Sequence, residues 1–207
     1  MESCSASKWI SLVCAMALVS CFPAIASSLY VYGDQFDLRI PADIDSSKGW
    51  MDDAVVEIPD HLTIIDLDVG INVTHTQVFD LQIFLESPAG KRICLNMYNP
   101  FDEYFEGENY TDTIFDDEAL LSIKEGEVPF TGRFRPMEPY ELSAFDGQDA
   151  FGPWRLQIYD AFYADIGTLN SVDLMVTAIE SPTLAVLTVS RSPGLRSASC
   201  SRPSWEL

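Results

Sequence analysis

Apolar and polar residues alternate with a period of two along much of the chain between residues 30 and 180, where no extended helical pattern occurs. The longest such run is "LTIIDLDVGINVTH", residues 62–75. Strict alternation indicates a β-strand that is buried on one face only. The residues of this run that we expect to point inward are Ile65, Leu67, Val69, Ile71 and Val73.

Two further segments predict a β-hairpin. In "DLQIFLES" the apolar residues Leu81, Ile83 and Leu85 alternate with polar ones. The turn-forming sequence "SPAG" follows at 87–90, and "KRICLNM" at 91–97 then has the composition of a return strand.

The alternation between residues 152 and 178 is interrupted once. Trp154, Leu156 and Ile158 share one face, the pattern stops at Asp160, and it resumes after Gly167. Residues 160–167 are therefore predicted to be a loop between two neighbouring antiparallel strands. A carboxylate at Asp160 can accept hydrogen bonds from free backbone amides where the chain leaves the sheet.

The remaining segments complete an all-β pattern. Further strands are predicted at 36–40, 54–58 and 119–123, and irregular stretches at 97–118 and 125–148. A loop of this length in a compact domain is usually functional or mobile. Many short strands separated by turn residues favour an antiparallel β-sandwich, on which we expect Phe130, Phe134 and Leu142 to pack.

The N-terminus has the pattern of an export signal. A single Lys8 precedes a short apolar run, and the small residues Ala24 and Ala26 predict cleavage after Ala26. Residues 18–21 also resemble a bacterial lipoprotein box, in which Cys21 would carry the lipid. Both readings place the protein outside the cell or on its surface, with no transmembrane segment.

These features predict one domain of ordinary size. The expected organisation is a signal peptide at 1–26, an N-terminal segment with a possible first strand at 27–49, the domain at 50–179 and an irregular tail at 180–207. After signal removal only Cys94 and Cys200 remain, so no disulfide framework is indicated. We expect Cys94 to be a small buried residue.

The formal net charge of −20 narrows the choice of partners. It opposes binding to nucleic acid and to anionic membranes, which depends on Lys and Arg. The acidity can serve solubility alone, or it can serve to bind calcium, which takes several oxygen ligands. No EF-hand spacing is present. The candidate calcium ligands are Asp116, Asp117 and Asp146, together with Asp102, Glu103, Asp112 and Glu118.

Several motifs together resemble the P domain, also called P/Homo B, of kexin- and furin-like proprotein convertases. The segment 71–95 matches the pattern of H-T, D-L, alternating apolar residues and S-P-x-G. Segments at 115–119, 129–136, 142–147, 152–160 and 166–174 follow in the family's order. The residues that carry the resemblance are His75, Thr76, Asp80, Leu81, Ser87, Pro88, Gly90, Gly152, Trp154, Asp160 and Gly167.

The resemblance covers roughly residues 50–179 and implies an eight-stranded jelly roll of the galactose-binding type. The family usually has Trp where this chain has Val172. The resemblance also implies a module without catalytic activity. Such a module accompanies a subtilisin-like serine endopeptidase and supports its folding, stability and calcium or pH response.

No catalytic apparatus is evident in the sequence itself. Neither His61 nor His75 lies in an H-G-T setting, and no G-T-S-x-A segment occurs. We interpret His75, Asp80 and Ser87 as structural, because buried polar groups are normally hydrogen-bonded. We interpret Trp154 as a core residue. The expected function is a secreted, non-catalytic module for stabilisation, binding or surface structure. Its partner would be a subtilisin-like protease or a surface component. The alternatives are an accessory subunit of a separately encoded serine endopeptidase and a calcium-dependent surface or carbohydrate binder.

Overall fold

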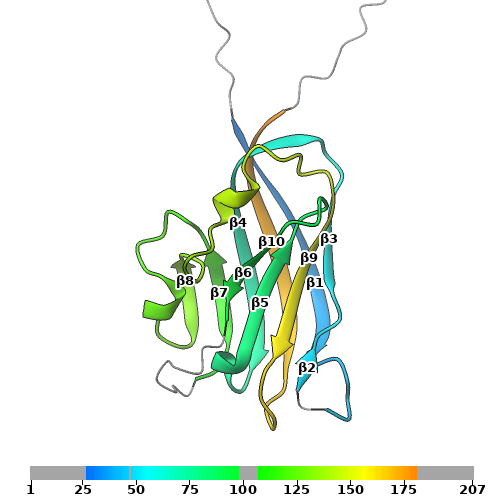
Figure 1. Ribbon diagram of the computed structural model, residues 1–207, viewed down its shortest axis with the longest axis vertical. Coiled ribbons are helices and arrows are strands. Elements are labelled where there is room, and N and C mark those ends of the chain that lie inside the picture. The colour runs from blue at the N-terminus through cyan, green and yellow to red at the C-terminus, as the bar shows by residue number, and fades with distance from the viewer. Residues whose placement is uncertain (1–26, 47, 98–106, 181–207) are drawn as a thin grey trace, which may run out of the picture.

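The computed structural model describes residues 27–46, 48–97 and 107–180, which form two β-sheets packed face to face (Figure 1). The predicted all-β sandwich is therefore confirmed. The strands of the first sheet, in spatial order, are β1 (Ser28–Ile40), β10 (Gly167–Glu180), β4 (Leu62–His75), β7 (Tyr110–Phe115) and β8 (Phe130–Phe134). Those of the second are β2 (Gly49–Trp50), β9 (Gly152–Asp160), β5 (Leu81–Glu86) and β6 (Arg92–Asn96), with β3 (Ala54–Ile58) paired to β9 beside β2.

The strands are joined by turns and three short 3-10 helices. These are η1 (Val78–Asp80), η2 (Ile123–Glu125) and η3 (Leu142–Phe145). The described residues contain ten strands, where the family resemblance implies eight. The named strand pairs are antiparallel except β7 and β8, which run parallel. No helix in the described ranges is long and apolar enough to cross a membrane.

Alternating side chains from both sheets fill the space between them. Trp154 is 1% exposed, packs edge-to-face on Phe145, and donates a hydrogen bond from Nε1 to the Ala150 carbonyl oxygen at 2.8 Å. Val172, which stands where the family usually has Trp, is also buried in this core. The inward residues predicted on β5 and β9 are buried, as is Cys94.

One residue of the longest strand faces the opposite way from its prediction. Ile65 is 44% exposed, whereas its neighbour Ile64 is buried. The cause is a change of register, because Asp66 pairs with Thr177 while Ile64 pairs with Ala178. The extra residue forms a β-bulge, and a bulge reverses the alternation beyond it.

The prediction that strands 152–160 and 167–178 are neighbours in one sheet was wrong. β9 pairs with β5, β2 and β3 in the second sheet, while β10 lies between β1 and β4 in the first. The loop at 160–167 therefore crosses from one sheet to the other. Alternation identifies a strand but carries no information about which strand it pairs with.

Two other segments differ from their predictions. Residues 119–123 form no strand and lead through a single bridge at Ser122 into η2. Conversely, β7 and β8 lie in stretches predicted to be irregular, although Phe130, Phe134 and Leu142 are buried as expected. In β7 a register shift follows Tyr110, and Asp112 has φ +48°, so the period of two is lost.

Some predictions concern residues outside the described ranges. They are the signal peptide at 1–26 with Cys21, the tail beyond residue 180 with Cys200, and the acidic residues Asp102 and Glu103.

Candidate functional site

Apart from Leu81 and Trp154, the residues that carry the family resemblance lie in two groups at opposite ends of the pair β5 and β9. Leu81 pairs with Asp160 at one end of this pair, and Glu86 pairs with Arg155 towards the other. The first group, which we call the histidine cluster, consists of His75, Thr76, Asp80, Asp160 and Gly167. The second, which we call the turn group, consists of Ser87, Pro88, Gly90 and Gly152.

The imidazole of His75 is the centre of the histidine cluster. Its side chain and that of Asp160 are both 0% exposed, with His75 Nε2 3.3 Å from Asp160 Oδ2. Nδ1 lies 2.9 Å from the Gln77 carbonyl oxygen and 3.1 Å from the Gln77 amide nitrogen. His75 Nδ1 therefore has a hydrogen-bond partner whether or not it carries a proton.

Two carboxyl groups share this buried site. Asp160 Oδ1 accepts a hydrogen bond from the Phe162 amide at 3.1 Å, so it holds the end of β9 in the way expected for an exit from the sheet. Asp80 is 2% exposed, and among the described residues its Oδ1 has no hydrogen-bond partner. Burial, together with the negative charges of Asp160 and Asp165, raises the pKa of Asp80 to about 6.

Gly167 permits close packing of β10 on this cluster. A Cβ atom at this position would overlap the Thr74 carbonyl oxygen and the ring of His75. Nearby, Thr76 Oγ1 donates a hydrogen bond to Asp165 Oδ1 at 2.7 Å. The end of β4, the start of β10 and the connecting loop are therefore fixed to one another around the imidazole.

The turn group closes the hairpin between β5 and β6. The Ser87 amide donates to the Lys91 carbonyl and the Gly90 amide to the Ser87 carbonyl, both at 2.8 Å. Gly90 has φ +79°, a conformation that glycine adopts at little cost. Gly152, with φ +115°, leaves room for the ring of Pro88, which would lie 3.1 Å from an added Cβ.

Among the described residues, the partners of the His75 ring do not include a serine hydroxyl. Ser87 follows β5 and Asp80 precedes it, so the two lie roughly 20 Å apart at about 3.3 Å per residue. The Ser87 hydroxyl donates instead to Gln148 Oε1 at 3.3 Å. Hydrolysis by a serine requires the hydroxyl within hydrogen-bond reach of the base. Within the described residues, the geometry of His75 and Asp160 serves to hold strand ends.

Two of the acidic residues considered for calcium, Asp116 and Asp117, form other contacts. Asp116 Oδ2 accepts from Arg133 at 2.7 Å, and both carboxylate oxygens of Asp117 accept from backbone amides at the start of η3. Burial and the charges of Asp66 and Asp117 raise the pKa of Asp146. No group of three acidic, histidine or cysteine side chains within the described residues is placed to hold a metal ion. The calcium site therefore stays a prediction from the acidic sequence, and the contacts of Asp116 and Asp117 argue against it.

The outer face of the second sheet carries a feature that the sequence analysis missed. Trp50, Phe84 and Tyr159 lie side by side, with ring centroids 6.0 Å apart for Trp50 and Phe84 and 5.0 Å apart for Trp50 and Tyr159. The Arg92 guanidinium lies over the Phe84 ring at 3.9 Å from its centroid. Trp50 is 48% exposed. We call these four residues the aromatic patch, and outward-facing aromatic residues on neighbouring strands are the signal that could have revealed it.

The fold and the two motif groups define a β-sandwich module whose motif residues stabilise strand ends and turns. The sequence profile of the proprotein convertase P-domain matches residues 64–176, more than half of the chain. The chain belongs to the proprotein convertase P-domain family.

Similarity to solved structures is more distant. The chain is 18% identical to the crystal structure of the Aeromonas sobria serine protease in complex with the chaperone ORF2, with a TM-score of 0.42 over 74% of this chain and 28% of that chain. A second crystal structure, of the serine protease of A. sobria, is 17% identical to this chain, with a TM-score of 0.40 over 73% of this chain and 27% of that chain. The chain thus spans under a third of the length of these proteins. No curated protein sequence matches it.

Proposed function

We propose that this chain is an exported, non-catalytic P-domain module that binds and stabilises a subtilisin-like serine endopeptidase, encoded with it or separately. The observation that carries the proposal is the family match over residues 64–176, which covers most of the sandwich. The geometry of the histidine cluster supports a role without catalysis, because both ring nitrogens of His75 face partners other than a hydroxyl.

The aromatic patch supports a role in binding. Trp, Tyr and Arg are enriched in the parts of interfaces that contribute most to affinity. Trp50, Tyr159 and Arg92 provide these residue types on one face of the second sheet. A rigid sheet presents them without a large loss of conformational entropy on binding. We infer that this face packs against the protease domain.

The absence of catalysis is tested on the full chain with a fluorophosphonate, which reacts with activated serines. We expect no labelling of the chain and no hydrolysis of fluorogenic peptides that subtilisin-like proteases cleave. Peptide hydrolysis that is lost in His75→Ala, while the thermal unfolding midpoint stays that of the wild type, would contradict the proposal.

The partner is tested by capture. The tagged full chain is incubated with proteins secreted by the source organism, and captured serine hydrolases are detected with the same fluorophosphonate. We expect the wild type to enrich a labelled protease and Trp50→Ala to lose it. Phe151→Ala is the matched control, because Phe151 is 47% exposed and stacks on His61 outside the aromatic patch. Capture that is equal for both variants would exclude this face.

A further inference from the structure

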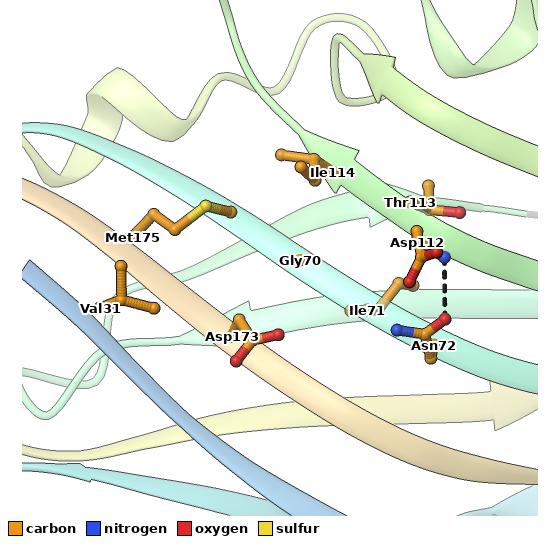
Figure 2. A pocket seen from close by; sticks show the side chains of 9 residues that line it. All are labelled: Val31, Gly70, Ile71, Asn72, Asp112, Thr113, Ile114, Asp173 and Met175. Carbon is orange, nitrogen blue, oxygen red and sulfur yellow. Dashed lines mark hydrogen bonds between the residues drawn. The ribbon is translucent and has the colours of Figure 1, made fainter.

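The outer face of the first sheet carries a groove that is separate from the histidine cluster and the aromatic patch. It has a volume of about 280 Å³ and is formed by residues of β1, β10, β4 and β7. Figure 2 shows the strand that carries Gly70 passing between Asp173 on one side and Asp112 on the other. The apolar side chains at the groove are Val31, Met175 and Ile114.

One glycine, Gly70, lines this groove, and a second, Gly33, lies beside it. Gly33 pairs with Asp173, and Asp173 pairs with Gly70 on its other side, so the carboxylate stands between two residues without side chains. Neither glycine has a positive φ, so the backbone conformation does not require glycine at either position. A glycine inside a strand weakens it and often marks a place where a ligand or another chain approaches closely.

The Asp173 carboxylate occupies space that a side chain at position 33 would fill. A Cβ atom on Gly33 would overlap Asp173 Oδ1, whereas one on Gly70 would lie 3.4 Å from Asp173 Cβ, an ordinary contact. A side chain at position 33 would thus displace the carboxylate, and one at position 70 would occupy the groove. Gly33 thus leaves space for the carboxylate of Asp173, and Gly70, itself buried, adds no side chain to the groove.

Within the described ranges, the two carboxylates of the groove have no cationic partner. Among the described residues, no hydrogen bond or ion pair reaches the side chain of Asp112 or of Asp173. Arg133, on the neighbouring strand β8, donates instead to Asp68 at 2.6 Å and Asp116 at 2.7 Å. The Asp112 backbone is held by a hydrogen bond from its amide to Asn72 Oδ1 at 2.8 Å, drawn in Figure 2.

We propose that this groove binds an arginine or lysine side chain of an extended segment of a partner polypeptide. The carboxylates supply charge complementarity to a cation. Val31, Met175 and Ile114 offer apolar surface to the aliphatic stem of such a side chain. A volume of about 280 Å³ lies just below the roughly 300–1,000 Å³ of pockets that enclose a whole small molecule. This proposal does not depend on the proposed role beside a protease.

The test measures fluorescence polarisation of a labelled peptide of alternating alanine and arginine with the full chain at near-physiological salt. A peptide with citrulline in place of arginine is the neutral control. We expect Asp173→Asn and Gly70→Val each to weaken binding of the arginine peptide at least about tenfold, the first by loss of charge and the second by filling the floor. Circular dichroism and thermal unfolding show whether each variant is folded. If Gly70→Val does not fold, the comparison of Asp173→Asn with the wild type still decides the test.

The matched control is Asp52→Asn, because Asp52 is exposed between β2 and β3, away from the groove, and its loss changes the net charge equally. We expect it to change the dissociation constant less than about twofold, since exposed charges at a distance are largely screened. Equal weakening by Asp52→Asn and Asp173→Asn would overturn the proposal, as would equal binding of the two peptides or no effect of either groove variant. Competition by free arginine as effective as that by the peptide would overturn the assignment to a polypeptide.

Discussion

At the scale of single residues, Asp80 couples folding to pH. Its pKa is raised from 3.8 to about 6 by burial and by the charges of Asp160 and Asp165. Below pH 3.8 the folded and unfolded states are both protonated. Between 3.8 and about 6 the unfolded state loses the proton that the folded state keeps, so the free energy of unfolding decreases as the pH rises through this window, by roughly 3 kcal/mol.

The variant Asp80→Asn removes this titration. We expect the free energy of unfolding of Asp80→Asn, relative to that of the wild type, to be greater at pH 8 than at pH 4, by up to roughly 3 kcal/mol. The reason is that the wild type carries a buried negative charge at pH 8, which the variant lacks, whereas at pH 4 both side chains are neutral in the folded state. Urea unfolding at the two pH values measures the difference. Asp52→Asn is the control for loss of an exposed carboxylate, and a difference between Asp80→Asn and wild type that is the same at both pH values would contradict the prediction.

Gly167 tests how tightly the histidine cluster is packed. An added Cβ would overlap His75 and the Thr74 carbonyl oxygen. We expect Gly167→Ala to decrease the free energy of unfolding by about 2 kcal/mol. Gly70→Ala is the matched control, because its Cβ meets only ordinary contacts, and we expect it to be neutral or slightly stabilising. Chemical denaturation compares the two, and a similar loss in both would show that the close approach at Gly167 is not responsible.

At the scale of elements, strand β8 depends on Arg133. This strand pairs only with β7 in the described sheet, and Arg133 connects it to Asp68 of β4 and to Asp116. We expect Arg133→Gln to decrease the free energy of unfolding by on the order of 1 kcal/mol, because two carboxylates lose a shared donor. Hydrogen exchange should become faster in β8 and stay unchanged in β1.

The control for this variant is Arg155→Gln in the second sheet. Arg155 lies 3.8 Å from Asp53 and 4.0 Å from Glu86, distances longer than those of Arg133 to its partners. It should therefore affect stability less and leave exchange in β8 unchanged. Faster exchange throughout the molecule in Arg133→Gln would indicate global destabilisation rather than local release of β8.

The inward residues of strands with unbroken alternation could be predicted from the sequence, whereas bulges and register shifts hid one strand and turned one residue of another outward. The segments 81–86 and 152–160 alternate without interruption, and their inward residues are those predicted. In β7 the register shift after Tyr110 hides the strand, and in β4 a bulge turns Ile65 outward. The neighbours of β9 and β10 could not be deduced either, since pairing depends on contacts between residues far apart in sequence.

The same limit applies to the candidate sites. The resemblance pointed to His75, Asp80 and Asp160, and these residues lie together. The groove was missed because Gly33 and Gly70 are brought beside Asp173 only by the pairing of three strands. The alternation of the segment 62–75 places Gly70 on the face opposite to Val69 and Ile71, but its neighbours on other strands could not be deduced. Single positions can thus be read from alternation, whereas sites built across strands require the register.

At the scale of the whole molecule, the net charge of −20 opposes folding through repulsion among the acidic residues. Raising the ionic strength from about 10 mM to about 150 mM shortens the screening length from about 30 Å to about 8 Å. We expect the melting temperature to rise over this range, as measured by scanning calorimetry. A melting temperature independent of sodium chloride would contradict the prediction.

Specific binding of calcium can be distinguished from this general effect of ionic strength. At equal ionic strength we expect calcium chloride and sodium chloride to give the same melting temperature, because Asp116 and Asp117 already bond to Arg133 and to backbone amides. A ligand that binds only the native state raises the melting temperature, and the rise continues with the logarithm of the ligand concentration above the dissociation constant. A further rise with calcium that a chelator reverses would contradict this expectation and establish the site suggested by the acidic sequence.

The pairing of Ser28 with Ala178 has a mechanical consequence. These residues begin β1 and lie near the end of β10, so the first and last strands of the sandwich are adjacent and antiparallel, with their outer ends together. A pulling force applied at both ends of the domain would load the bonds between these strands one after another rather than all at once, because the ladder bonds run perpendicular to the strands. The domain should therefore unzip under low tension, with β1 the first element to peel away.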